Sequence, residues 1–204
     1  VITWSEELGM FAGEAYSRNG RNWTLNSSFP AGTRLRHVGW SPALKLFTGI
    51  ISDEPGNTNP KCYISYDGIS WSFTTNLTDG SATPRIINGD QITWSPTYSK
   101  FVFGGTQGVY SSTNGRSWTF ISVTFIQNTI HYSTKVQWID ELKMFVVPGG
   151  YSYDGITWTA KSIYFYLGLL AFQTSTRFAP FLWVPELNKL LSGGPGYTQT
   201  SKTF

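Results

Sequence analysis

Large apolar side chains recur at fixed spacings along this chain of 204 residues. Five short apolar segments end in a tryptophan, and another large apolar residue follows each tryptophan seven positions later. The five pairs are Trp4 and Phe11, Trp40 and Phe47, Trp94 and Phe101, Trp138 and Phe145, and Trp183 and Leu190. A further apolar residue lies two positions before each tryptophan, which is the period of a β-strand. The pattern therefore predicts, in each of five units, two consecutive strands joined by a turn.

A second aromatic series marks the end of each unit. Its members lie six positions after a small hydroxyl residue and are Trp23, Trp71, Trp118, Trp158 and Phe204. All nine tryptophans of the chain thus occupy only two positions of the repeat. The four segments that end in tryptophan read S-x-D/N-G-x-x-W, with Asn19, Asp67, Asn114 and Asp154 before the glycine. Asp-Gly and Asn-Gly are strong signals for a tight hairpin, and the Ser and Asp or Asn side chains can hydrogen-bond the turn backbone. We therefore expect a third and a fourth strand in each unit, joined at this turn.

A repeat of this length points to a propeller or an array. The sequence predicts an all-β chain, a five-bladed β-propeller of four-stranded antiparallel blades, folded as a single domain over 1–204. The expected blades are 1–36, 37–90, 91–134, 135–179 and 180–204, the last one incomplete. The chain starts at Val1 rather than methionine and stops where a fourth strand should begin. Part of a six- or seven-bladed propeller in a longer polypeptide is therefore the alternative.

The S-x-D/N-G-x-x-W pattern resembles the Asp-box, or BNR repeat, of sialidase-like β-propellers. The fuller pattern, W-S-P/E-x-L-x-x-F followed by Y-S-x-D-G-x-x-W-T, is similar to propeller repeats of phage and large-virus structural and appendage proteins. The resemblance covers essentially the whole chain, although the fifth copy, from Tyr197 to Phe204, has neither the Asp nor the Gly. It implies a propeller fold, a turn-stabilising role for the motif residues and a location outside the cell or on the virion surface.

Composition narrows the possible functions. Charged residues make up 13% of the chain, aromatic residues 17%, and the net charge is +3. No basic stripe or lysine-rich tail is present, so we expect no nucleic-acid partner. The longest apolar run, 163–172, is too short to span a bilayer as a helix, so we expect no membrane insertion. Cys62 is the single cysteine, which excludes an intrachain disulfide.

Binding residues are expected on one face of the propeller. The fourth-to-first and second-to-third loops share the face that usually carries the binding surface in this kind of fold. The charged candidates there are Arg34, Arg36, Asp53, Glu54, Arg85, Asp90, Lys135 and Arg177. A sialidase clamps its substrate carboxylate with three arginines. Arginines at 34 or 36, 85 and 177 could form such a triad, but they stand at different offsets from the tryptophans of their units.

No residue matches a catalytic nucleophile or acid by motif, so we predict no catalytic residue. His37 and His131 lack metal-ligand spacing with Cys62 and are expected to be surface or core histidines. A single carboxylate per isolated turn supplies too few ligands for calcium. We therefore expect neither a metal nor a cofactor.

Three functional hypotheses follow. The first is a non-catalytic binding or structural module in a virion or extracellular appendage, whose partners are surface glycans, protein surfaces or other virion subunits. The second is a sialidase-like glycoside hydrolase or lyase. The third is an intracellular protein-interaction platform, which the lone cysteine permits.

Overall fold

A computed structural model describes residues 1–53, 60–79, 91–105, 108–124, 135–147, 150–160, 181–187, 189–194 and 197–200. These residues form β-strands and one short 3-10 helix, Pro185–Leu187, so the chain is all-β as expected. Unit 1 contains β1 (Ile2–Ser5), β2 (Met10–Gly13), β3 (Ala15–Tyr16) and β4 (Thr24–Leu25). Unit 2 contains β5 (Thr33–Ser41), β6 (Leu46–Asp53), β7 (Lys61–Ser65) and β8 (Ser72–Asn76). Unit 3 contains β9 (Thr93–Ser95), β10 (Lys100–Gly104), β11 (Gly108–Ser112) and β12 (Thr119–Ser122). Unit 4 contains β13 (Gln137–Ile139), β14 (Met144–Val147), β15 (Gly150–Ser152) and β16 (Thr159–Ala160). Unit 5 contains β17 (Phe181–Val184), β18 (Lys189–Gly194) and β19 (Tyr197–Thr200).

Each unit is an antiparallel sheet whose strands pair in chain order. Units 2, 3 and 4 are four-stranded sheets, and unit 5 has three strands among the described residues. Unit 1 consists of two two-stranded sheets, β1–β2 and β3–β4, which a bridge between Phe11 and Ser17 connects. Phe204, where the fourth strand of unit 5 should begin, lies outside the described residues.

The tryptophan-to-apolar spacing sets the strand register. Seven positions bring the two residues directly opposite each other across the first turn, as in Trp40 and Phe47 or Trp94 and Phe101. Their ring centroids lie 4.4 Å and 4.7 Å apart, respectively. The phenylalanine then contacts the second tryptophan of its unit, at 6.2 Å for Phe101 and Trp118. We call the side of each sheet that carries these rings the aromatic face.

The first turn of each unit repeats as well. In units 1 to 3, the serine after the tryptophan accepts a hydrogen bond from the backbone N–H three positions on, as in Leu44 N to Ser41 Oγ at 3.1 Å. The fifth residue after the tryptophan has positive φ in units 1 to 4, namely Gly9, Lys45, Ser99 and Lys143. Non-glycine residues seldom adopt this conformation. It also occurs in unit 4, where Ile139 stands in place of the serine, so the feature common to all four turns is the aromatic pairing across the turn.

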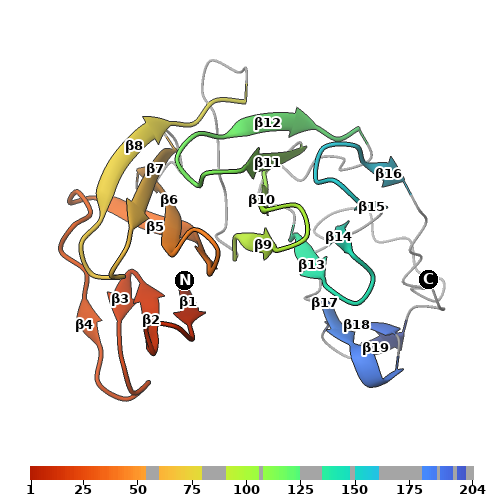
Figure 1. Ribbon diagram of the computed structural model, residues 1–204, viewed down its shortest axis with the longest axis horizontal. Coiled ribbons are helices and arrows are strands. Elements are labelled where there is room, and N and C mark those ends of the chain that lie inside the picture. The colour runs from red at the N-terminus through yellow and green to blue at the C-terminus, as the bar shows by residue number, and fades with distance from the viewer. Residues whose placement is uncertain are drawn as a thin grey trace.

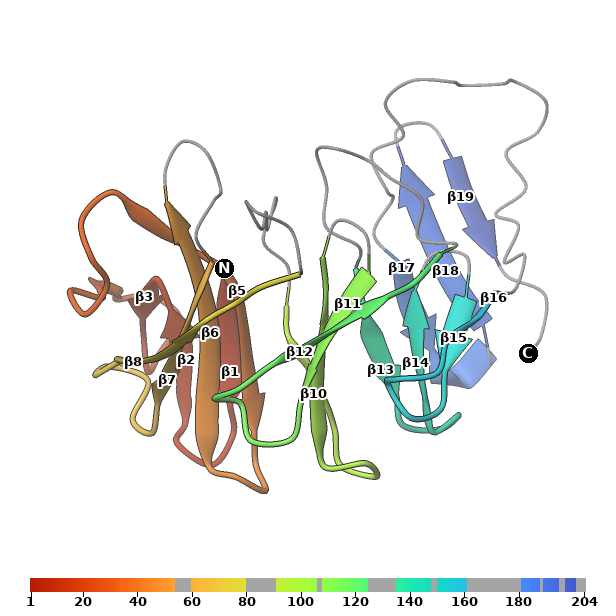
Figure 2. The ribbon, with the colours of Figure 1, turned by 90° about the horizontal axis from the view of Figure 1, so that it is seen from above.

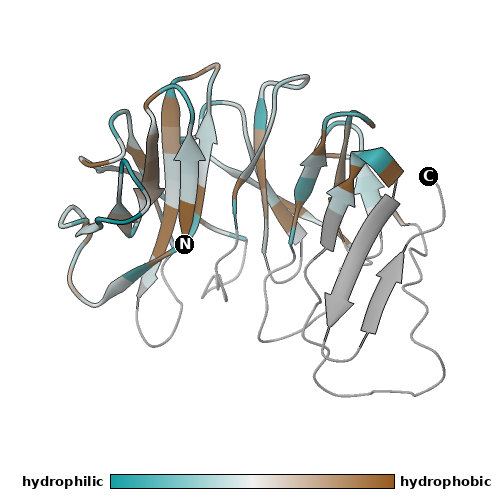
Figure 3. Cartoon of the chain, turned by 90° about the horizontal axis from the view of Figure 1, so that it is seen from below, coloured by the Kyte–Doolittle hydropathy of each residue, from teal (hydrophilic) through white to brown (hydrophobic). Residues whose placement is uncertain are grey.

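The five units stand side by side in an open arc (Figure 1), with unit 1 and unit 5 at its ends. The first strands lie innermost: Val38 in β5 pairs in parallel with Gln91, just before β9, and Ile92 N donates to Val38 O at 2.9 Å. First strands therefore run the same way in these neighbouring units. The first turns and the S-x-D/N-G turns lie along one rim of the arc (Figure 2), and hydrophobic residues concentrate within the strands (Figure 3).

The core lies between the sheets. One apolar cluster joins Met10 and Ala12 of unit 1 to Phe47 and Trp71 of unit 2. The next clusters join units 2 and 3, units 3 and 4, and units 4 and 5 in the same manner. The aromatic face of each unit thus packs against the opposite face of the unit before it. This burial of apolar area is the main favourable term that holds the arc together.

One expectation needs correction. The S-x-D/N-G segment does not form a two-residue hairpin, because β7 ends at Ser65 and β8 starts only at Ser72. The N–H groups of that turn donate hydrogen bonds to the side-chain oxygens of Ser65 and Asp67 rather than to a residue of the opposite strand. The two tryptophans of unit 1, Trp4 and Trp23, are 44% and 42% exposed, and no described sheet precedes this unit.

Candidate functional site

Three of the predicted binding residues gather at one end of unit 2. Arg34 and Arg36 lie near the start of β5, and Asp53 lies at the end of β6, where it pairs with Thr33. Arg36 Nε donates to the buried Ser52 Oγ at 3.1 Å. Arg34 Nη1 lies 3.9 Å from Glu14 Oε1 of unit 1, with both side chains substantially exposed. This end of the sheet therefore presents cationic groups at the junction of units 1 and 2.

The remaining candidates are spread along the chain. Lys135 lies in unit 4, two positions before β13, and so on the same rim as the start of β5. Glu54, Arg85, Asp90 and Arg177 lie outside the described residues. Convergence of the predicted arginines on one pocket therefore stays a prediction. We call the rim that carries Arg34, Arg36 and Lys135 the cationic rim.

The opposite rim carries the four S-x-D/N-G turns. Their side-chain oxygens accept hydrogen bonds from backbone N–H groups of the same turn. In unit 2, Gly68 N donates to Ser65 Oγ at 2.8 Å, and Asp67 Oδ1 accepts from Ile69 N at 2.8 Å and Ser70 N at 2.7 Å. The other three turns repeat these bonds with Asn19, Asn114 and Asp154. The glycines have φ between 67° and 72°, the left-handed region that glycine adopts without strain.

This hydrogen bonding controls the acidity of the two carboxylates. Partial desolvation raises the pKa of Asp154, but the N–H groups of Ile156 and Thr157 and the hydroxyl of Ser152 outweigh it and hold the pKa at about 2. Desolvation likewise raises the pKa of Asp67, but the N–H groups of Ser70 and Ile69 outweigh it and leave this pKa below its usual value. A carboxyl group held ionised in this way is unsuited to act as a general acid near neutral pH.

Replacing Asp67 and Asp154 together by asparagine should cost at most about 1 kcal/mol per site at pH 7, because the amide oxygen accepts the same N–H groups. Stability from the two carboxylates is present above the ordinary carboxyl pKa of about 4 and is lost as the pH falls toward 2. The natural chain should therefore lose stability more steeply over this interval than the double variant. Urea denaturation followed by tryptophan fluorescence across pH 2 to 7 would measure the difference.

The reverse substitution, Asn114→Asp, provides the control. It gives unit 3 the motif of units 2 and 4 and should steepen the loss of stability in acid. Equal slopes in all three proteins would show that the turn carboxylates do not govern acid stability.

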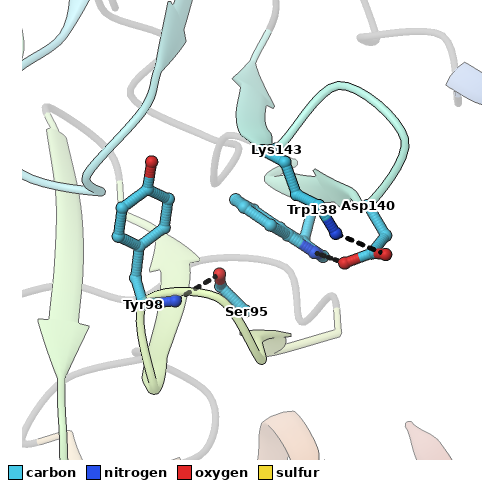
Figure 4. A network of polar contacts seen from close by, with 5 residues as sticks. All are labelled: Ser95, Tyr98, Trp138, Asp140 and Lys143. Atoms are coloured by element: carbon cyan, nitrogen blue, oxygen red, sulfur yellow. Dashed lines mark hydrogen bonds and ion pairs between the residues drawn. The ribbon is translucent and has the colours of Figure 1, made fainter.

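A second polar cluster lies on the same rim as the S-x-D/N-G turns (Figure 4). Trp138 Nε1 donates to Asp140 Oδ1 at 3.1 Å, and Lys143 Nζ contacts Asp140 Oδ2 at 2.8 Å. Tyr98 of unit 3 packs edge-on against Trp138 of unit 4, with ring centroids 5.7 Å apart. Bonds from Lys143 and Trp138 lower the pKa of Asp140. The sequence analysis did not identify this cluster, although one signal was present: Tyr98 takes the position held by leucine in units 1, 2, 4 and 5. The cluster therefore acts as a contact between units.

A cavity of about 240 Å³ lies between units 3 and 4. Its lining comprises Lys100, Ser111, Ser112, Thr113, Ser117, Thr119, Ile121 and Ile156. Its charged group is already engaged, because Lys100 Nζ donates to Asp154 O at 2.8 Å. Its volume is also below the range typical of small-molecule sites. We therefore do not assign it a ligand.

The described histidine and the cysteine are core residues. His37 is fully buried with its ring 4.7 Å from Phe103, and His131 lies outside the described residues. Cys62 Sγ accepts from Trp118 Nε1 at 3.3 Å and lies 3.2 Å from Gly115 O, so it joins units 2 and 3. Burial raises the pKa of its thiol, which opposes thiolate chemistry. Within the described part of the chain, no group of three or more His, Cys, Asp or Glu residues is arranged to hold a metal.

No family model matches this chain, and no curated protein sequence matches it. Its structure is similar to that of an ancestral GH74 enzyme, with a TM-score of 0.53 and 15% identity over 79% of this chain and 25% of the enzyme. The chain thus spans a quarter of that protein, and at this identity the likeness concerns the all-β fold alone.

Two weaker likenesses carry no argument. One is to an N-acetylgalactosamine deacetylase from F. plautii in complex with blood group B trisaccharide, with a TM-score of 0.43 and 13% identity over 74% of this chain and 63% of that chain. The other is to a nidogen/laminin complex, with a TM-score of 0.38 and 10% identity over 68% of this chain and 53% of that chain. In the described part of the molecule, no helix has both the length and the apolar character needed to cross a membrane.

Proposed function

We propose that the five units are blades of a β-propeller and that the chain is a non-catalytic binding or structural module. The side-by-side packing of the sheets, their innermost first strands and the likeness to the GH74 enzyme support the propeller. On this proposal the S-x-D/N-G turns are Asp-boxes, which hold the third and fourth strands of each blade together.

The difference between the two rims carries the functional part of the proposal. On the rim that carries the S-x-D/N-G turns, the carboxylates of Asp67 and Asp154 accept hydrogen bonds from backbone N–H groups of their own turns. This bonding gives them a structural role. On the cationic rim, the Arg34 side chain is 60% exposed, and one carboxylate near it is that of Glu14, at 3.9 Å. An exposed guanidinium of this kind can bind a ligand carboxylate in bidentate fashion.

The chemistry of the cationic rim favours acidic partners. Carboxylated surface glycans or acidic loops of neighbouring subunits fit it, in the setting of a virion or extracellular appendage. The low overall charge of the chain, 13% charged residues, makes such a localised basic group more selective than a general polycationic surface would be.

Binding to a panel of matched acidic and neutral glycans would test the proposal. We expect affinity for carboxylated glycans, reduced about tenfold by Arg34→Ala because one charge-assisted contact is lost. Arg21→Ala, which removes an exposed arginine from an Asp-box turn on the other rim, should leave affinity unchanged. Binding that Arg34→Ala does not alter would contradict the site. Hydrolysis of a fluorogenic sialoside by the chain would contradict the non-catalytic role.

A further inference from the structure

Two of the four S-x-D/N-G turns contain an Asn-Gly step, Asn19-Gly20 in unit 1 and Asn114-Gly115 in unit 3. Asparagine is especially prone to deamidation before glycine, because glycine has no side chain to hinder attack of its backbone nitrogen on the asparagine amide carbon. Both asparagines are exposed, so water reaches their side chains. The Asp-Gly steps of units 2 and 4 have the sequence that this reaction would leave.

The reaction exchanges an amide for a carboxylate, with water as its co-reactant. The glycine nitrogen forms a bond to the asparagine Cγ, the Cγ–Nδ2 bond breaks, and the amide nitrogen leaves as ammonia with the proton of the former glycine N–H. Water then opens the resulting cyclic imide at either of its carbonyl carbons. Opening at one carbon gives aspartate, and opening at the other gives isoaspartate, in which the main chain runs through Cγ.

The folded turn restrains both groups that must meet in this reaction. Gly20 N donates to Ser17 Oγ at 2.9 Å, so the attacking nitrogen is directed toward the serine. Asn19 Oδ1 accepts from Arg21 N at 2.9 Å and from Asn22 N at 2.8 Å, so the amide is directed toward the following residues. The turn of unit 3 repeats these three bonds. Ring closure therefore requires local opening of the turn.

The two turns differ in the residue before the second tryptophan. In unit 3 this residue is Ser117, whose Oγ lies 3.1 Å from Asn114 Nδ2 and 3.3 Å from Asn114 Oδ1. The hydroxyl at this position also bonds the carboxylate in units 2 and 4. Asn22 takes the position in unit 1, and between the described residues Asn19 and Asn22 only the backbone bond is present. The side-chain amide of Asn19 therefore lacks a restraint that Asn114 has.

We propose that Asn19 is a deamidation site of this chain and that the residue before the second tryptophan controls the rate. Asn114 reacts more slowly, because Ser117 holds its amide at both the oxygen and the nitrogen. Aspartate at position 19 keeps the turn, since Asp67 and Asp154 accept the same N–H bonds in their own units. Isoaspartate lengthens the main chain and breaks this pattern. At neutral pH the reaction adds a negative charge to the rim that carries the S-x-D/N-G turns, whatever the cationic rim binds.

Peptide mass spectrometry would measure the rate at each asparagine after incubation at mildly alkaline pH in water enriched in heavy oxygen. In the folded chain we expect Asn19 to react before Asn114, and both at least about tenfold more slowly than in urea, because the turn must open first. Asn22→Ser should slow the reaction at Asn19 about fivefold, as one hydrogen bond is gained. Ser117→Asn should speed the reaction at Asn114 about fivefold, as one is lost. Ser70→Asn makes the same change in unit 2 and should alter neither rate.

Two controls separate the turn from other effects. In urea the variants should react at the rates of the natural chain, and circular dichroism without urea would confirm that each is folded. Asn19→Asp supplies the aspartate product and should keep the natural far-UV spectrum. Equal rates with and without urea would overturn the proposal, as would substitutions at 22 and 117 that change neither rate. Reaction at Asn114 while Asn19 stays unlabelled in the folded chain would overturn it as well.

Discussion

Replacing Phe101 with alanine should lower the free energy of unfolding by about 3–5 kcal/mol, as expected for truncation of a fully buried phenylalanine. Its side chain has no exposed surface, and its ring lies 4.7 Å from Trp94 and 6.2 Å from Trp118. The substitution would open a cavity between units 2 and 3 that neither sheet can collapse to fill, since both are fixed by their own ladders. Urea denaturation monitored by far-UV circular dichroism would measure the loss.

Phe11→Ala is the matched control. Phe11 occupies the same repeat position and contacts its two tryptophans at 4.6 Å and 5.7 Å, but no described sheet covers it. At a concentration where the chain is monomeric, we expect less than half of the loss seen for Phe101→Ala. Equal losses would mean that ring contacts within a unit, rather than packing between units, hold the structure together.

The sequence was sufficient to predict the antiparallel pairing of consecutive strands, which units 2, 3 and 4 show in full. The seven-residue spacing forces Trp94 opposite Phe101 whatever the neighbouring sheets do, because a short turn leaves one register available. The S-x-D/N-G bonds were predictable for the same reason, since donor and acceptor lie within a few residues. Features that depend on residues close together in the chain could therefore be predicted from their spacing.

Packing between units and the binding site depend on more distant contacts. Nothing in the spacing shows that Trp4 is exposed while Trp183 is buried, because that depends on which sheet precedes each unit. The pairing of Arg34 with Glu14, and of Arg36 with Ser52, likewise arises from the junction of two sheets. The sequence around Arg85 and Arg177 follows no repeat spacing, so their positions could not be inferred from it.

Replacing Gly68 with alanine should destabilise the chain by about 1–3 kcal/mol more than replacing Gly20 does. Both glycines have positive φ, 72° and 69°, so the cost of placing alanine in the left-handed region, about 1–2 kcal/mol, is common to both. They differ in their surroundings. A new Cβ at Gly68 would meet the Cβ of Ala12 at 2.8 Å, whereas at Gly20 its nearest neighbour would be Phe11 Cε2 at 3.5 Å.

The comparison separates two reasons for a glycine in this motif. Thermal and urea denaturation of the two variants, with Gly155→Ala as a third, would rank them. Gly155 lies between the extremes, because its Cβ would meet Val102 Cγ2 at 3.0 Å and Phe145 Cε2 at 3.1 Å. A loss of stability that decreases in the order Gly68, Gly155, Gly20 would show that the glycine lets one unit pack closely against the unit before it. Three equal losses would mean that turn conformation alone requires the glycine, and that its close contact with the preceding unit contributes nothing measurable to stability.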